Sequence, residues 1–136
     1  MKIQYRIWNE EDKEMIYPGG EDDYEVYVIT PNGNLYQEYH NDCSELELIY
    51  LSPKKYTVML YTGFKDKDGK EIYEGDLIKI DNIDNPFLLL HDYFKVIWEN
   101  GAYWLLSRNK AFKHLISTLE YETIDVVGNI YEGVKD

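Results

Sequence analysis

Strand-like segments recur along this 136-residue sequence and leave little room for helices. They are rich in β-branched and aromatic residues, polar and apolar positions alternate in several of them, and they cover residues 24–29, 35–39, 55–61, 77–80, 93–98, 102–106 and 124–131. Successive side chains of a strand point to opposite faces, so a period of two is typical of half-buried strands. The sequence therefore predicts a mainly β protein, a β-rich α+β fold with at most one short helix.

Two Asn-Gly pairs separate neighbouring segments of this kind. Asn32-Gly33 lies between residues 24–29 and 35–39, and Asn100-Gly101 lies between residues 93–98 and 102–106. Asn-Gly favours a two-residue type I′ turn, in which both central residues have positive φ. Each pair therefore predicts a β-hairpin.

Two segments leave the type of element open. Apolar residues recur near helical spacing over residues 109–119, which favours a short helix there, although a strand is also possible. Residues 46–51 fit a helix or a strand equally well. Turn-forming residues flank residues 41–53, and this predicts an N-terminal β lobe over residues 1–52 and a second lobe over residues 53–136, unless the two form one compact unit.

The charge balance bears on the kind of partner. The chain has 26 acidic and 14 basic residues, a formal net charge of −12, which disfavours nucleic-acid binding and favours a protein partner, in particular a basic one. Its 14 tyrosines either fill half-exposed sheets or form an interaction surface, and they favour a homo-oligomer. The first residues lack the apolar region of a signal peptide and no stretch reaches membrane-span length, so we expect a cytoplasmic protein without a membrane partner.

The sequence offers few groups for catalysis or for holding a metal. Cys43 is the single cysteine, so no internal disulfide can form, and nothing nearby completes a zinc site with His40. No serine lies in a G-x-S-x-G turn. Carboxylate pairs, such as Asp81 with Asp84, or Glu71 with Glu74 and Asp76, are expected by chance in so acidic a chain. We therefore expect no cofactor and no enzyme activity.

Two charged segments are candidate recognition sites. The first is a loop with Asp68-Gly69 at its turn, in which lysines alternate with carboxylates; its candidate residues are Lys65, Asp66, Lys67, Asp68, Lys70, Glu71, Tyr73 and Glu74. The second is the locally basic run with Arg108, Lys110 and Lys113, which could contact a nucleic-acid backbone. A charged turn and a solvated face are the structural alternatives for these two segments.

Three separated blocks resemble the YopX family of phage and prophage proteins. The opening block is Arg6-Ile7-Trp8-Asn9 followed by residues 13–17, and the last is Val127-Gly128-Asn129-Ile130-Tyr131-Glu132. The most specific block is residues 61–78, which contain the family string T-G-x-K-D-x-x-G-x-x-I-Y-E-G-D-x-[VI]. Residues 20–57 and 82–95 show no family pattern, and residues 133–135 replace the usual Asn-Pro-Glu.

The resemblance implies a small β-rich protein encoded by a phage or prophage, with an SH3-like barrel in residues 53–136 and an oligomeric state. It implies no catalytic or ligand residues. Together with the charge, it leads us to expect a non-enzymatic, oligomeric accessory module that binds a host or phage protein. A nucleic-acid-binding accessory factor is the alternative, and a metal-dependent hydrolase built on paired carboxylates is the second alternative.

Overall fold

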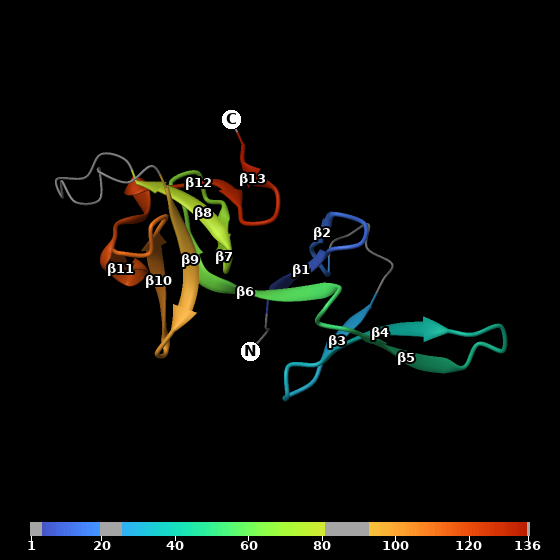
Figure 1. Ribbon diagram of the computed structural model, residues 1–136. Helices are drawn as coiled ribbons and strands as arrows, with labels where there is room; N and C mark the ends of the chain where they lie inside the picture. The colour runs from blue at the N-terminus through green and yellow to red at the C-terminus, as the bar shows by residue number, and fades with distance from the viewer. Residues whose placement is uncertain (1–3, 20–25, 81–92, 136) are drawn as a thin grey trace. The chain divides into compact units, whose positions relative to one another are not determined.

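The structure is a computed structural model that describes residues 4–19, 26–80 and 93–135 (Figure 1). These residues form thirteen β-strands and two short 3-10 turns, and no α-helix occurs among them. The mainly β fold is therefore confirmed. Among the described segments, no helix has the length and apolar character that crossing a bilayer requires.

The chain divides into two compact units, Met1–Met59 and Leu60–Asp136. The division lies inside β6 (Tyr56–Lys65), the longest strand, so this one strand contributes to both units. The predicted boundary after residue 52 precedes this strand. We describe each unit by itself.

The first unit has a small apolar core. Its central strand β1 (Tyr5–Asn9) pairs antiparallel with β2 (Glu14–Ile16), and the backbone N–H of Glu10 donates to the carbonyl of Lys55 at the start of β6. Ile7, Leu35 and Leu51 are the buried residues of this core. They are surrounded by partly buried aromatic and aliphatic side chains: Tyr5, Ile16, Tyr27, Ile29, Tyr56 and Val58.

A three-stranded antiparallel sheet in the order β3-β4-β5 completes this unit. Its strands are β3 (Tyr27–Ile29), β4 (Leu35–His40) and β5 (Leu46–Leu51). The first predicted hairpin is therefore confirmed, and residues 46–51 are a strand. The turn differs from type I′, because Gly33 has a positive φ of 84° but Asn32 does not, and the N–H of Thr30 donates to Asn34 O across a longer loop.

The second unit is dominated by a curled six-stranded antiparallel sheet in the order β11-β10-β9-β8-β12-β13 (Figure 1). Its strands are β8 (Asp76–Ile80), β9 (Phe94–Glu99), β10 (Ala102–Ser107), β11 (Lys113–Leu115), β12 (Ile124–Asn129) and β13 (Gly133–Val134). The end of β6 pairs with β7 (Glu71–Tyr73). Its core consists of buried aliphatic side chains and one aromatic: Ile72, Ile78, Ile80, Phe94, Val96, Leu105, Ile116 and Ile124.

The second predicted hairpin is confirmed, since Asn100 and Gly101 have φ values of 50° and 80° between β9 and β10. The helix favoured over residues 109–119 is wrong. Those residues form a tight turn, strand β11 and a 3-10 turn over Ile116–Thr118. The Asn109 Oδ1 accepts the N–H of Ala111 and Lys110 has a φ of 62°, so the backbone leaves helical geometry there.

Candidate functional site

The predicted recognition loop lies between β6 and β7 and is held by its own polar side chains. Three glycines, Gly63, Gly69 and Gly75, have φ values between 79° and 88°, a region that other residues rarely adopt. Thr62 is buried; its hydroxyl donates to Ile72 O at 2.7 Å and accepts the N–H of Phe64 at 3.1 Å. The glycines and the threonine therefore set the path of the backbone.

The Asp66 carboxylate is the centre of this loop and is only 2% exposed. Its Oδ1 accepts the backbone N–H groups of Asp68 and Lys70, both at 2.9 Å, and its Oδ2 accepts the N–H of Val126 at 3.1 Å. Charge-assisted hydrogen bonds of this kind are stronger than neutral ones. The carboxylate closes the loop and also ties it to β12.

A second buried carboxylate closes the other end of the segment. Asp76 is 2% exposed, and its Oδ2 accepts the backbone N–H of Tyr73 at 2.8 Å. Glu74 pairs with Leu60 twice, because its Oε1 accepts the Leu60 N–H and its own N–H donates to Leu60 O, both at 3.0 Å. Glu71 accepts the Tyr73 hydroxyl at 3.1 Å. Four of the eight candidate loop residues thus have structural roles, namely Asp66, Glu71, Tyr73 and Glu74.

The other four candidates, Lys65, Lys67, Asp68 and Lys70, are exposed around the turn. Two of them, Lys65 and Lys67, line a shallow hollow of ≈ 430 Å³ together with Gly63, Phe64, Asp66, Gly69, Leu119 and Ile124. Lys67 lies 3.5 Å from a carboxylate oxygen of Asp125. These four exposed side chains therefore remain the candidates for a polar recognition rim on this loop.

Asp66, Asp68 and Asp125 bring carboxylate oxygens within 4.8 Å of one another. This cluster includes the buried Asp66, which already accepts three backbone hydrogen bonds, and Asp125, which pairs with Lys67. Protein groups therefore already engage two of its three members. Of the carboxylates considered from the sequence, Asp81 and Asp84 lie outside the described residues.

The basic run does not stay together in the structure. Arg108 and Lys110 line a hollow of ≈ 160 Å³ with Leu77, Tyr93, Lys95, Leu106 and Ser107. Lys113 belongs to β11 instead, where its Nζ lies 3.4 Å from Glu99 and 4.6 Å from the centre of the Trp104 ring. Sequence reasoning missed Lys95, since only the pairing of β9 with its neighbours places it beside Arg108 and Lys110.

Burial raises the pKa values of two tyrosines of the second unit, so the stability of this unit is expected to fall at alkaline pH. The pKa of Tyr61 is raised by burial and by nearby Glu71, and the pKa of Tyr103 is raised by burial and by Glu74. A tyrosine whose pKa is raised by folding contributes to stability, and this contribution is fully present below its unfolded-state pKa of about 10. The contribution is lost as the pH rises through the folded-state pKa, because the unfolded chain ionises first.

We therefore expect the free energy of unfolding, measured in urea, to fall as the pH rises through and above the ordinary tyrosine value of about 10. The double variant Tyr61→Phe/Tyr103→Phe should lose less over the same range, because neither ring can ionise. Tyr39→Phe, in the other unit, is the matched control. An equal alkaline loss in the double variant and in the control would contradict the assignment.

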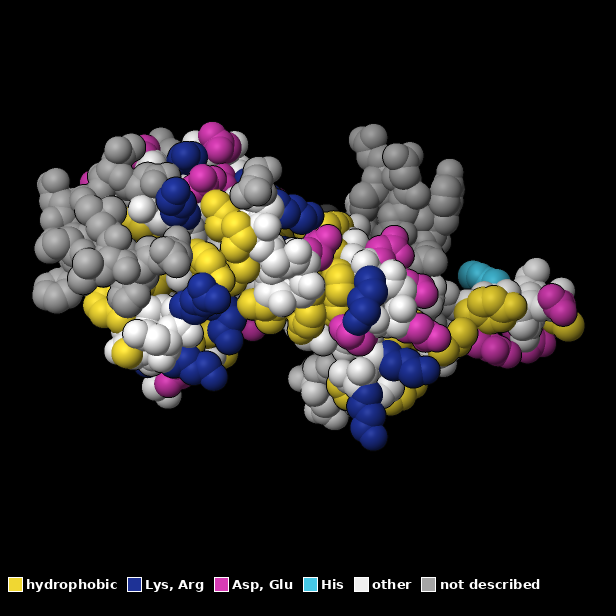
Figure 2. Space-filling model, turned by 45° about the horizontal axis from the view of Figure 1, so that its top comes forward, with side chains coloured by type: hydrophobic (Ala, Val, Ile, Leu, Met, Phe, Trp, Pro, Cys, Tyr) yellow, Lys and Arg dark blue, Asp and Glu magenta, His cyan; other side chains and the backbone are white. Residues whose placement is uncertain are grey.

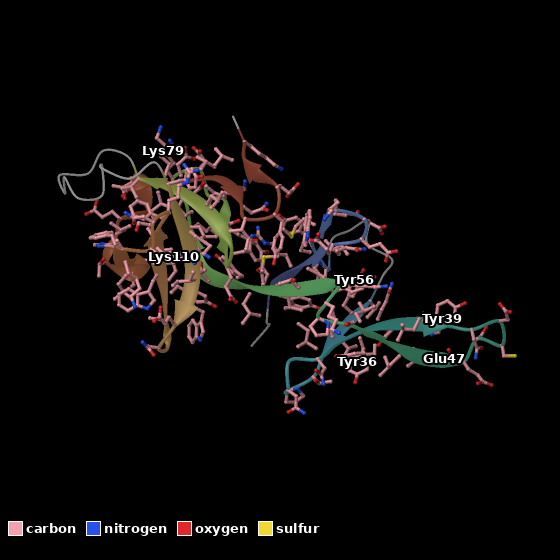
Figure 3. The ribbon with its side chains drawn as sticks, viewed as in Figure 1. Tyr36, Tyr39, Glu47, Tyr56, Lys79 and Lys110 are labelled. Atoms are coloured by element: carbon pink, nitrogen blue, oxygen red, sulfur yellow. The ribbon has the colours of Figure 1, made fainter. Side chains whose placement is uncertain are left out.

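The first unit exposes an apolar surface that the sequence did not single out. On β4 and β5, large side chains are 44–56% exposed; they are Tyr39, Leu46, Leu48, Ile49 and Tyr50, here called the hairpin surface (Figure 2). They lie on both faces of the sheet. Tyr50 lies opposite Tyr36 and shares its face, and the Tyr36 and Tyr39 side chains point in opposite directions (Figure 3). The Tyr36 and Tyr50 rings pack across the strands with centroids 5.5 Å apart.

β5 is also an edge strand of its three-stranded sheet, so the backbone N–H and C=O groups on its outer side have no strand partner within that sheet. The segment 35–51 contains Glu38, Asp42, Glu45 and Glu47 and no lysine or arginine. Among the described residues, this segment therefore combines an apolar surface, an edge strand and negative charge. The apolar composition of residues 46–51 was the signal available in the sequence, but the exposure of these side chains follows only from the fold.

The fold is that of a small all-β protein with two units and a glycine-rich loop closed by buried aspartates. The chain belongs to the YopX family, because the family model described as YopX protein matches residues 4–135. The resemblance noted from the three sequence blocks is thereby confirmed.

Solved structures with the same fold include the crystal structure of protein yopX from Bacillus subtilis, with a TM-score of 0.62, 22% identity, and 96% of this chain and 94% of that chain covered. The crystal structure of protein EF1440 from Enterococcus faecalis has a TM-score of 0.56, again with 22% identity and with 96% and 94% covered. No curated protein matches the sequence at a significant level.

Proposed function

We propose that this YopX-family protein is a non-enzymatic accessory protein of a phage or prophage, and that it binds a basic protein of its host or phage through the hairpin surface. The exposure of apolar side chains on both faces of an edge hairpin is the observation behind this proposal. Soluble proteins rarely leave such a surface uncovered unless it binds something. We infer in addition that the curled sheet of the second unit is an SH3-like barrel, as the family resemblance implies.

The charge of the hairpin favours a basic partner over a second copy. Residues 35–51 contain four carboxylates and no lysine or arginine, so two hairpins that paired along β5 would bring like charges together. A partner that presents lysine or arginine beside an apolar strand would match both the charge and the apolar side chains. An exposed strand edge binds such a partner by adding one strand to the sheet.

The test uses a pair of equivalent substitutions. Ile49 on β5 is 44% exposed and Ile130, which follows β12 in the other unit, is 46% exposed. Ile49→Glu and Ile130→Glu thus make the same chemical change at similar exposure. The tagged protein and both variants are incubated with nuclease-treated bacterial lysate, and any stoichiometric protein is purified and titrated against all three by calorimetry.

We expect the captured protein to be basic and its affinity to fall at least about tenfold for Ile49→Glu, because a buried carboxylate replaces an apolar contact. Ile130→Glu should bind within about twofold of the unmodified protein. Equal binding by both variants would contradict the hairpin as the binding surface. Light scattering that shows an oligomer dissociated by Ile49→Glu would instead identify a second copy as the occupant.

A further inference from the structure

Three cationic side chains meet at the 160 Å³ hollow on the second unit, in a chain whose net charge is −12. They are Lys95 from β9 and Arg108 and Lys110 from the turn after β10; Figure 3 shows Lys110 close to β9. Among the described residues, no carboxylate lines this hollow and none of the three cations forms an ion pair. Lys67 and Lys113 of the same unit, by contrast, both pair with carboxylates.

The floor of the hollow is a row of side chains across three strands. Lys95 lies directly opposite Leu77 of β8 and Leu106 of β10. Residues opposite one another in antiparallel strands present their side chains on the same face. Phe94 and Val96, the neighbours of Lys95, point to the opposite face and into the core. The Lys95 ammonium therefore lies on the outer face of the sheet between two apolar side chains.

The wall of the hollow is a turn with a fixed conformation. Ser107 is 2% exposed; its N–H donates to Phe112 O at 2.8 Å, its hydroxyl donates to Asn109 Oδ1 at 2.7 Å and accepts the N–H of Phe112 at 3.0 Å. The N–H of Lys110 donates to Ser107 O at 2.9 Å, and Lys110 adopts a φ of 62°. These bonds hold the backbone that presents Arg108 and Lys110.

The Arg108 guanidinium lies over the Tyr93 ring, with its carbon 5.6 Å from the ring centre. A ring contact of this kind orients the guanidinium plane and leaves its N–H groups available at the edge. Arginine with free N–H groups binds phosphate in a bidentate manner, and lysines add point charges. The three cations thus lie beside apolar side chains of the hollow, namely Leu77, Tyr93 and Leu106.

We propose that this hollow, here called the cationic pocket, binds the phosphate group of a small phosphate monoester with an apolar or aromatic body. Its volume of ≈ 160 Å³ is well below the roughly 300–1,000 Å³ of sites that enclose drug-sized ligands, so it accommodates the phosphate and the group next to it. A nucleic-acid strand fits less well, because further phosphates would extend over a chain of net charge −12 and Lys113 is engaged elsewhere.

Phenyl phosphate is the probe, since it joins a dianionic phosphate to one aromatic ring. Its binding to the full-length protein is measured by NMR titration of the backbone amide signals of residues 93–95 and 106–111. Arg108→Gln and Lys110→Gln each remove one cation from the cationic pocket. Lys113→Gln removes a cation that lies outside it and serves as the matched control.

We expect saturable shifts, a dissociation constant at least about fivefold higher in each pocket variant, and a change below about twofold in Lys113→Gln. Benzenesulfonate, a monoanion of similar shape, should bind more weakly than phenyl phosphate. Pocket variants that bind phenyl phosphate like the unmodified protein would overturn the proposal. So would tighter binding of a thymidine oligonucleotide that Lys113→Gln weakens as much as Arg108→Gln does.

This inference goes beyond the proposed function, because the cationic pocket and the hairpin surface belong to different units. The hairpin variant Ile49→Glu should bind phenyl phosphate normally, and Arg108→Gln should bind the captured protein normally. Failure of one proposal is therefore distinguishable from failure of the other.

Discussion

Replacing Asp66 with alanine is expected to lower the free energy of unfolding of the second unit by about 3–5 kcal/mol, because three backbone N–H groups lose their acceptor at once. Two of these donors belong to the loop and the third, of Val126, belongs to β12. The substitution therefore opens the loop and also detaches it from the six-stranded sheet. Asp66→Asn should cost less, since one oxygen acceptor remains.

The measurement is urea unfolding followed by the indole N–H signals of Trp98 and Trp104, both of which lie in the second unit. Asp68→Ala is the matched control: it is the same substitution two residues away, at an exposed carboxylate, and we expect a change within about 0.5 kcal/mol. A loss below about 1 kcal/mol for Asp66→Ala would show that water replaces the carboxylate as the acceptor.

Ile7→Ala is expected to destabilise the first unit by about 3–4 kcal/mol, near the middle of the range for large-to-small core substitutions. Ile7 is fully buried and is one of the three buried residues that form this core, with Leu35 and Leu51. A core this small has few neighbours that could move to fill the cavity. The proposed protein-binding activity should fall in parallel, because the hairpin surface belongs to the same unit.

The indole signal of Trp8, which is 3% exposed in the first unit, reports this loss directly. Ile7→Val, which removes a single methylene, should cost about 1 kcal/mol, and Ile49→Ala on the exposed hairpin should cost less than Ile7→Ala. If Ile7→Ala and Ile49→Ala had equal effects, Ile7 would not have the packing role that its burial indicates.

The strands were predictable where one pattern was unambiguous. Asn100-Gly101 between two alternating segments predicted a hairpin, and both residues have the positive φ of that turn. Asn32-Gly33 predicted the hairpin but not its turn, because Thr30 and Asn34 close a longer loop. Residues 46–51 have apolar side chains at both odd and even positions, so the sequence showed no clear alternation there. Only the pairing with β4 established that this segment is a strand.

The helix predicted over residues 109–119 does not form, and the reason is local. Phe112, Leu115, Ile116 and Leu119 do have helical spacing, yet Ser107 and Asn109 hydrogen-bond the backbone into a turn before a helix can begin. Leu115 then pairs opposite Trp104 in the sheet. Side-chain hydrogen bonds to the backbone compete with helix formation in this way, and apolar periodicity alone does not include them.

The candidate sites were predictable only in part. The charged residues and glycines of the loop were evident, but an aspartate buried among lysines looks in sequence like its exposed neighbours. Asp66 is distinguished by the backbone N–H groups of Asp68, Lys70 and Val126 that it accepts, the last of them sixty positions away. Lys95 joins Arg108 and Lys110 through strand register, and register is a property of pairs of strands rather than of one segment.

The absence of lysine and arginine from the hairpin also determines which reagents can detect it. No lysine or arginine occurs between Lys13 and Lys54, so amine-directed crosslinkers and trypsin act outside residues 35–51. Cys43, exposed in the turn between β4 and β5, is the single cysteine of the chain. A maleimide dye therefore labels the tip of the hairpin alone, and its fluorescence reports what approaches this surface without any engineered residue.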